Sequence, residues 1–204
     1  MNEALPAIDA QTTALLVMDY QPAVLGMLGE SAPALLARVG EAIRIARAHR
    51  VLVAYVRVAF DDADYDSVPP HSRFAPILKA VGEGFHSDSP ATAVHDDIAP
   101  QAGDIVVRKT RVGAFSTTDL DRQLKERGII TLLLAGISTG GVVLSTVRDA
   151  ADRDYQVIVV ADACADPKPG VHEFLIGTMF PAQALVVDLA DLEGLLSRVD
   201  TAET

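Results

Sequence analysis

Short aliphatic runs alternate with longer amphipathic segments along most of this 204-residue chain. The runs at 14–18, 51–58, 104–109, 130–135, 157–161 and 183–187 are typical of strands buried on both faces. Apolar residues recur at helical spacing in segments 31–50, 117–128, 140–153, 171–179 and 189–199. Repeated strand–helix units predict a Rossmann-like α/β fold, with a mainly parallel sheet and helices on both faces, in one domain over 1–204.

Two of the predicted helices carry capping residues at their starts, and the second also carries a stop signal. Ser31 is expected to cap the first, with Pro33 in its opening turn. Thr117 or Thr118 is expected to cap the second, which ends at Gly128.

Segment 59–103 breaks the alternation, because it is rich in Asp, Pro, His and Gly. We expect a long connection with one short helix near 74–81, and a connection of this length in a compact domain is usually functional. It contains Asp61, Asp62, Asp64 and Asp66, with His71 nearby. A metal site is one reading, but the spacing fits no known loop, and a solvated acidic loop without metal is the expectation.

Composition narrows the classes of function. The net charge of −11 argues against nucleic acid and anionic membranes as partners, since both would be repelled. Acidic residues interrupt the longest apolar runs, so no run is long enough to span a membrane. The first residues lack the basic start of a signal peptide, so we expect none. Cys164 is the sole cysteine, so it forms no internal disulfide, and we expect it to be buried and inert. A cytoplasmic location follows as the expectation.

Polar residues follow three of the predicted strands. Asp19 comes after five apolar residues, Lys109 ends another apolar run, and Ser138 opens a glycine-rich turn. Ligands in parallel α/β sheets bind beyond the carboxyl ends of strands, so these residues are candidates for one site. Burial would favour protonation of Asp19 unless Lys109 supplies a cation. The alternative is a structural ion pair or two solvated strand ends.

The turn at 136–140 reads Gly-Ile-Ser-Thr-Gly, which matches the G-x-S-x-G elbow of serine hydrolases. His172 lies downstream, with Asp162 and Asp166 before it, so the order Ser, Asp, His is available. The alternative is an ordinary strand–helix turn. The free backbone N–H groups of the helix start would then bind an anion or a developing oxyanion.

Four motifs in order together resemble the isochorismatase-like (cysteine hydrolase) superfamily. Leu-Val-Met-Asp-Tyr-Gln at 16–21 is similar to its first-strand motif, and Gly-Asp-Ile-Val-Val-Arg-Lys-Thr-Arg-Val-Gly-Ala-Phe at 103–115 to its lysine motif. Segment 136–150 is similar to the nucleophile motif and its helix, and 162–165 to the next strand end. The likeness covers the chain from about residue 12 to the last helix.

The resemblance implies a catalytic Asp–Lys–Cys triad, of which Asp19 and Lys109 match. The position of the family cysteine is Val142, which has no nucleophile, so thioester chemistry there is not expected. Family members without the cysteine hydrolyse a vinyl ether with a protonated Asp, and Asp19 would act in the same way. The residues that mark isochorismate and zinc specificity are absent, so neither isochorismate, a metal nor any other cofactor is implied.

The resemblance also implies a cis peptide before Ser138 and an oxyanion hole formed by the amides of Ser138 and Val142. Phe85 is a further candidate for the pocket wall. The candidate substrate- and oxyanion-binding residues are Gln21, Arg57, Phe60, Phe115, Ser138 and Thr139. Arg57 would hold a substrate carboxylate as a bidentate pair, or else form a salt bridge or an interface contact.

Two functions remain open, with a serine hydrolase using Ser138 as a distant third. The first is a hydrolase of a small organic molecule that uses Asp19 as general acid or base, without a covalent cysteine intermediate. The second is a catalytically silent ligand-binding or assembly protein on the same fold. The resemblance implies a homodimer or homotetramer in either case.

Overall fold

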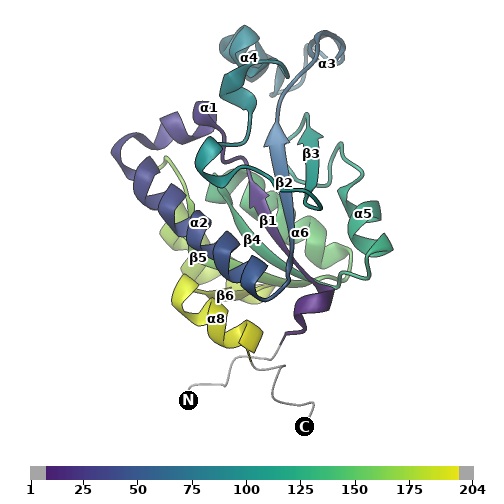
Figure 1. The fold of residues 1–204 in the computed structure, drawn as a ribbon. Helices are drawn as coiled ribbons and strands as arrows, with labels where there is room; N and C mark the ends of the chain where they lie inside the picture. Colours follow the sequence, from purple (N-terminus) through teal and green to yellow (C-terminus); the bar gives the residue numbers. More distant parts are fainter. Residues whose placement is uncertain (1–7, 198–204) are drawn as a thin grey trace.

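One parallel sheet of six strands, in the order β3-β2-β1-β4-β5-β6, forms the centre of the molecule (Figure 1). The computed structural model describes residues 8–197. The strands are β1 (Thr13–Met18), β2 (Leu52–Val58), β3 (Ile105–Lys109), β4 (Thr131–Ile137), β5 (Gln156–Ala165) and β6 (Leu185–Val187). The parallel α/β fold predicted from the alternation is confirmed.

Helices cover both faces of this sheet (Figure 1). α2 and α8 pack on one face, and α5 and α6 pack on the other. The helices are α1 (Pro22–Leu25), α2 (Ala32–Ala48), α3 (Asp62–Asp66), α4 (Ala75–Val81), α5 (Leu120–Glu126), α6 (Leu144–Asp152), α7 (Val171–Phe174) and α8 (Leu189–Ser197). Within 8–197, none of the helices has both the length and the apolar character needed to cross a bilayer.

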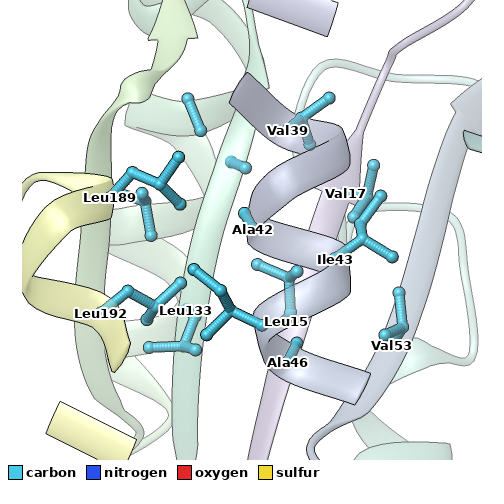
Figure 2. Packing of buried hydrophobic residues seen from close by; sticks show 14 of the residues in the cluster. Leu15, Val17, Val39, Ala42, Ile43, Ala46, Val53, Leu133, Leu189 and Leu192 are labelled. Atoms are coloured by element: carbon cyan, nitrogen blue, oxygen red, sulfur yellow. The ribbon is translucent and has the colours of Figure 1, made fainter. Parts of the chain in front are cut away.

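Strand β1 shows why the aliphatic runs become buried strands. Its successive side chains point to opposite faces, so Leu15 and Val17 join the core under α2 while Leu16 and Met18 join the core under α6. Figure 2 shows Leu15 and Val17 beside Ile43 of α2, with α8 closing the same layer. Each fully buried Leu or Val contributes about 1.5–3 kcal/mol, so both cores hold β1 at the centre.

The connection 59–103 is more ordered than its composition predicts. The expected helix is present as α4, but α3 precedes it and was not predicted. Asp61 and Asp64 form a capping box at the start of α3, in which each side chain accepts from the other residue's backbone N–H. Both carboxylates also pair with Arg108 of β3. The acidic cluster is therefore partly a cap and an ion pair, and not only a solvated loop.

Several predicted helix starts differ in detail. Ser31 makes no capping bond, because its hydroxyl donates to the carbonyl of Leu28. The N-cap residue of α5 is Asp119 and neither Thr117 nor Thr118, although the Thr118 hydroxyl accepts a bond from the N–H of Leu120, the first residue of α5. The helix predicted at 140–153 opens as a π-helical turn, Thr139–Val143, before α6. The helix predicted at 171–179 is α7 followed by a second π turn, and the predicted end at 198–199 lies outside the described residues.

Candidate active site

Three strand ends meet at the carboxyl edge of the sheet. Asp19 follows β1, Lys109 is the last residue of β3, and Ser138 follows β4. The strand order reverses direction between β1 and β4, since β2 and β3 lie to one side and β5 and β6 to the other. Binding pockets of parallel α/β folds form at such a switch point, so the topology places these residues where a ligand would bind.

The backbone at Asp19 takes an uncommon conformation, with a φ of 63°. Its N–H donates to the carbonyl of Val56 at 2.8 Å, and its carbonyl accepts from the N–H of Gln21 at 2.9 Å. Left-handed backbone is more accessible to Asp than to most residues with a side chain. The sharp bend ends β1 and turns the carboxyl toward Lys109.

Asp19 and Lys109 form a buried ion pair. Lys109 Nζ lies 2.8 Å from Asp19 Oδ2, and the two side chains are 3% and 7% exposed, respectively. Lys109 Nζ also donates to the carbonyl of Arg111 at 3.2 Å. The pairing suggested by the two strand ends is therefore present in the fold.

The second carboxylate oxygen of Asp19 has no protein partner. Oδ1 is buried and accepts no hydrogen bond from any residue in 8–197. A buried acceptor left unsatisfied costs about 1–3 kcal/mol, which is relieved if the oxygen meets a donor from a ligand. Oδ1 is thus the oxygen of the ion pair that has an unused capacity to accept a hydrogen bond.

Burial raises the pKa of the Asp19 carboxyl above its ordinary value, although the charge and hydrogen bond of Lys109 act to lower it. The raised pKa favours the neutral acid, whereas the nearby ammonium group limits the shift. A carboxyl balanced in this way can donate a proton, and can accept one after it has ionised.

A cavity of about 280 Å³ opens onto this pair. Its walls are mostly apolar and come from the ends of β1, β2, β3 and β4, from α1 and α4, and from the segments that follow them. The lining residues are Asp19, Val24, Met27, Val58, Phe60, Phe74, Ile77, Leu78, Val81, Phe85, Lys109, Arg111, Val112, Ile137, Ser138, Gly141 and Val142. We call this cavity the Asp19 pocket.

The turn after β4 forms one wall of the Asp19 pocket. The peptide bond between Ile137 and Ser138 is cis, as the resemblance implied. The Ser138 carbonyl accepts from the N–H groups of Gly141 and Val143 at 3.1 and 3.3 Å. A Cβ on Gly141 would lie 2.7 Å from Ser138 Oγ, so a larger residue there would force the serine side chain to move. The side chain of Val142 lines the pocket and is 2% exposed.

The partners expected for a serine elbow lie elsewhere. His172 Nδ1 is 2.9 Å from Thr139 Oγ1, and among the described residues no histidine bonds to Ser138. Asp166 accepts from the N–H of Gly140 at 2.7 Å, and Asp162 accepts from the backbone at the start of α8. The His172 and Asp166 contacts hold the turn in place, and the geometry does not support a Ser–His–Asp arrangement.

Gln21, one of the candidate binding residues, lies outside the pocket lining. It is fully buried, and its Nε2 donates to the carbonyls of Val58 and Thr92 at 2.9 and 2.6 Å. Its Oε1 accepts from the N–H of Val58 at 2.8 Å. The amide therefore joins the end of β1 to β2 and to the connection 59–103.

Arg57, Phe115 and Thr139 also lie outside the pocket lining, whereas Phe60 and Phe85 are part of it. Arg57 donates to two backbone carbonyls of the connection, at 3.3 and 3.2 Å, and burial lowers its pKa. Phe115 stacks on a tyrosine ring on the α5–α6 side of the sheet, with the ring centroids 6.0 Å apart. Sequence order placed these residues near the site but could not give the direction of their side chains.

The pocket also contains residues that the sequence did not single out. Arg111 and Val112 follow Lys109, Phe74 and Ile77 come from α4 and its start, and Met27 follows α1. The lysine motif contains Arg111, so its position two residues beyond Lys109 was the available signal. Nothing in the pattern of α4 indicated which of its faces would meet the pocket.

Cys164 is buried, as expected, and lies near the end of β5, outside the pocket lining. Burial raises the pKa of its thiol to about 12. A thiol of this kind is almost entirely protonated near neutral pH and is a poor nucleophile. Cys164 therefore does not stand in for a cysteine at position 142.

Comparison with known proteins agrees with the motifs. The Isochorismatase domain model matches residues 13–191. The isochorismatase family protein YwoC of Bacillus subtilis (strain 168) is 34% identical over 178 residues, which cover 85% of this chain and 88% of YwoC. Ureidoacrylate amidohydrolase RutB of Methylobacterium radiotolerans is 30% identical over 210 residues, covering 93% of this chain and 81% of RutB.

A solved structure leads to the same family. An isochorismatase family protein from Burkholderia thailandensis matches with a TM-score of 0.80 and 29% identity, over 95% of this chain and 99% of that protein. The family model spans most of the chain, and relatives of at least 30% identity extend over most of its length. This chain therefore belongs to the isochorismatase family of hydrolases.

Proposed function

We propose that this protein hydrolyses a small organic molecule by general acid/base chemistry at Asp19, without a covalent cysteine intermediate. The observation that carries the proposal is the open Oδ1 of Asp19, which is buried, unpaired within 8–197, and part of a carboxyl that lines an apolar pocket. A carboxyl kept partly neutral by burial is suited to proton transfer.

The proposed cycle restores the acid after each turnover. Asp19 donates its proton to the bond that breaks, and the resulting carboxylate takes a proton from the water that attacks. The ammonium group of Lys109, 2.8 Å from Oδ2, lowers the free-energy cost of ionising the Asp19 carboxyl. The backbone amides of Ser138 and Val142 are the proposed donors to developing negative charge on the substrate.

The valine at position 142 distinguishes this proposal from catalysis by a cysteine thiol. A valine side chain cannot attack a carbonyl, so the direct nucleophile in our scheme is water. The relative RutB is named as an amidohydrolase, which puts amides first among the bonds to test, followed by esters and vinyl ethers.

The competing proposal is a catalytically silent binding or assembly protein on the same fold. The observation that favours it is the same valine, because a site without its nucleophile can persist for ligand binding alone. The Asp19–Lys109 pair does not decide the matter, since removing one partner of a buried pair costs about 3–5 kcal/mol whatever its function.

The test is hydrolysis of a panel of small amides, esters and vinyl ethers by the wild type, Asp19→Asn and Val142→Cys. We expect wild-type turnover that falls roughly 100-fold to 10,000-fold in Asp19→Asn, the usual contribution of a general acid or base. Asp61→Asn is the matched control, because Asp61 pairs with Arg108 outside the pocket and should leave turnover unchanged.

The opposite pattern would support the silent protein. In that case the wild type turns over no substrate, and amide hydrolysis appears only in Val142→Cys. Circular dichroism of each variant distinguishes a lost activity from a lost fold.

We also propose that the protein assembles as a homodimer or homotetramer. Light scattering coupled to size-exclusion chromatography measures the mass directly, and a monomer at micromolar concentration would contradict this part of the proposal.

A further inference from the structure

Three ionisable side chains line the Asp19 pocket, namely Asp19, Lys109 and Arg111. The first two neutralise each other in their ion pair. Arg111 has no such partner, because no carboxylate in 8–197 lies within ion-pair distance of its guanidinium group. The three side chains of the lining therefore carry a net positive charge, within a chain whose net charge is −11.

The guanidinium group of Arg111 is held but not saturated. One Nη donates to the carbonyl of Thr110 at 2.6 Å, and the group lies over the ring of Phe74, 5.6 Å from its centroid. The carboxylate of Asp64 is close enough for Arg111 to lower its pKa, but Asp64 makes its ion pair with Arg108, which it shares with Asp61. Within the described chain, the remaining N–H donors of Arg111 have no acceptor.

Neighbouring arginines are already engaged. Arg57, the candidate from the sequence, donates to backbone carbonyls and lies outside the pocket lining. Arg108 binds two aspartates and a carbonyl oxygen. Arg111 therefore combines pocket exposure with unused donors, which neither of the other two does.

The position of Arg111 relative to Asp19 limits which ligands could contact both residues. Asp19 is 5% exposed, whereas Val112, next to Arg111, is 44% exposed, and Met27 and Ile77 in the same lining are 59% and 53% exposed. The pocket thus runs from a buried acid to an exposed rim, and Arg111, which is partly buried, precedes Val112 of that rim. Between them the walls are aliphatic and aromatic, with Phe60 and Phe85 among them.

We propose that Arg111 is a specificity-determining residue that binds the carboxylate of a ligand whose compact apolar body fills the pocket toward Asp19. This assignment deepens the proposed function by naming its substrate class, a monocarboxylate that carries the scissile bond near Asp19, and it rests on that function. Planar guanidinium and carboxylate groups form paired hydrogen bonds, which a neutral group of the same shape cannot match.

Equilibrium binding tests this without requiring turnover. Isothermal titration calorimetry would compare hexanoate, octanoate and phenylbutanoate with the methyl ketones in which CH₃ replaces the charged oxygen. The ketones keep the shape, lose the charge and cannot be hydrolysed. We expect the wild type to bind at least one acid roughly 10-fold to 100-fold more tightly than its ketone, the range for a charged hydrogen-bonded pair.

Variants assign that preference to one residue. Arg111→Gln should abolish it while leaving ketone affinity within about twofold, Arg111→Lys should keep part of it, and Arg57→Gln should keep it whole. Full preference in Arg111→Gln, loss in Arg57→Gln, or no acid preference in the wild type would overturn the proposal. Acid binding through Arg111 by a protein without turnover would instead reject the proposed hydrolase and retain this site.

Discussion

Arg108 and Lys109 are neighbours on β3, yet their side chains enter opposite kinds of ion pair. Arg108 bridges Asp61 and Asp64 in a partly exposed cluster, where the arginine side chain is 30% exposed. Lys109 meets Asp19 in a pair that is almost completely buried. One step along an edge strand thus separates a solvent-accessible cluster from the candidate site.

The two acids respond in opposite directions. Burial acts to raise the pKa of Asp64, but hydrogen bonds from the Asp61 amide and from Arg108 outweigh it, so the pKa falls below its ordinary value. For Asp19 burial is the stronger influence, and its pKa rises despite Lys109. The number of donors and the access of water decide whether an ion pair keeps its acid charged or prepares it for proton transfer.

Removing the cation from each ion pair should give the largest difference in unfolding free energy between the two regions. Lys109→Met leaves Asp19 buried without a counter-charge, and near neutral pH we expect a loss of about 3–5 kcal/mol in unfolding free energy. Arg108→Met should cost about 1 kcal/mol, because water can solvate the aspartates it leaves behind. Urea unfolding of both variants measures the difference, and equal losses would contradict the contrast.

The pH dependence should follow Asp19. Its folded-state pKa is raised, so the stabilisation from the protonated form is complete below the unfolded pKa and is lost as pH rises through the folded value. For reactions that need the acid, kcat/KM should fall about tenfold per pH unit above that folded pKa. Asp61→Asn should keep this pH profile. A profile that persists unchanged in residual Asp19→Asn activity would assign the titration to another group.

The smallest effects are expected in the Arg108 cluster. Asp61 caps α3 and pairs with Arg108, and Asp61→Asn keeps a side chain able to cap while it removes the charge. We expect at most about 1 kcal/mol from the lost ion pair, and about 1 kcal/mol more in Asp61→Ala from the lost cap. Chemical denaturation resolves the two steps, and a cost for Asp61→Asn close to that of Lys109→Met would refute the ordering.

The sheet and the meeting of Asp19 with Lys109 could be predicted because both follow from simple rules. Strands buried on both faces read as continuous aliphatic runs, and parallel strands end at one edge. Asp19 and Lys109 each stand at the end of such a run. Position along a strand therefore carried most of the usable information about the site.

Side-chain direction and the connection 59–103 could not be predicted in the same way. Gln21 and Arg57 point to backbone groups of that connection, whose path no periodic pattern reveals. Helix α3 begins with a capping box made of aspartates, in a stretch so acidic that it read as a loop. Arg111 lay inside the lysine motif, but its hydrogen bond to the Thr110 carbonyl and its contact with Phe74, which locate its guanidinium group, could not be predicted from that motif.

The burial of Cys164 makes this protein a convenient host for site-specific chemistry. It is the sole cysteine of the chain, and its thiol is 4% exposed with a pKa raised to about 12. Alkylating reagents attack thiolates, so the folded wild type should give almost no background labelling. A fluorophore or spin label attached through Val112→Cys, at a position that lines the Asp19 pocket and is 44% exposed, would therefore report on that pocket without removal of any native residue elsewhere.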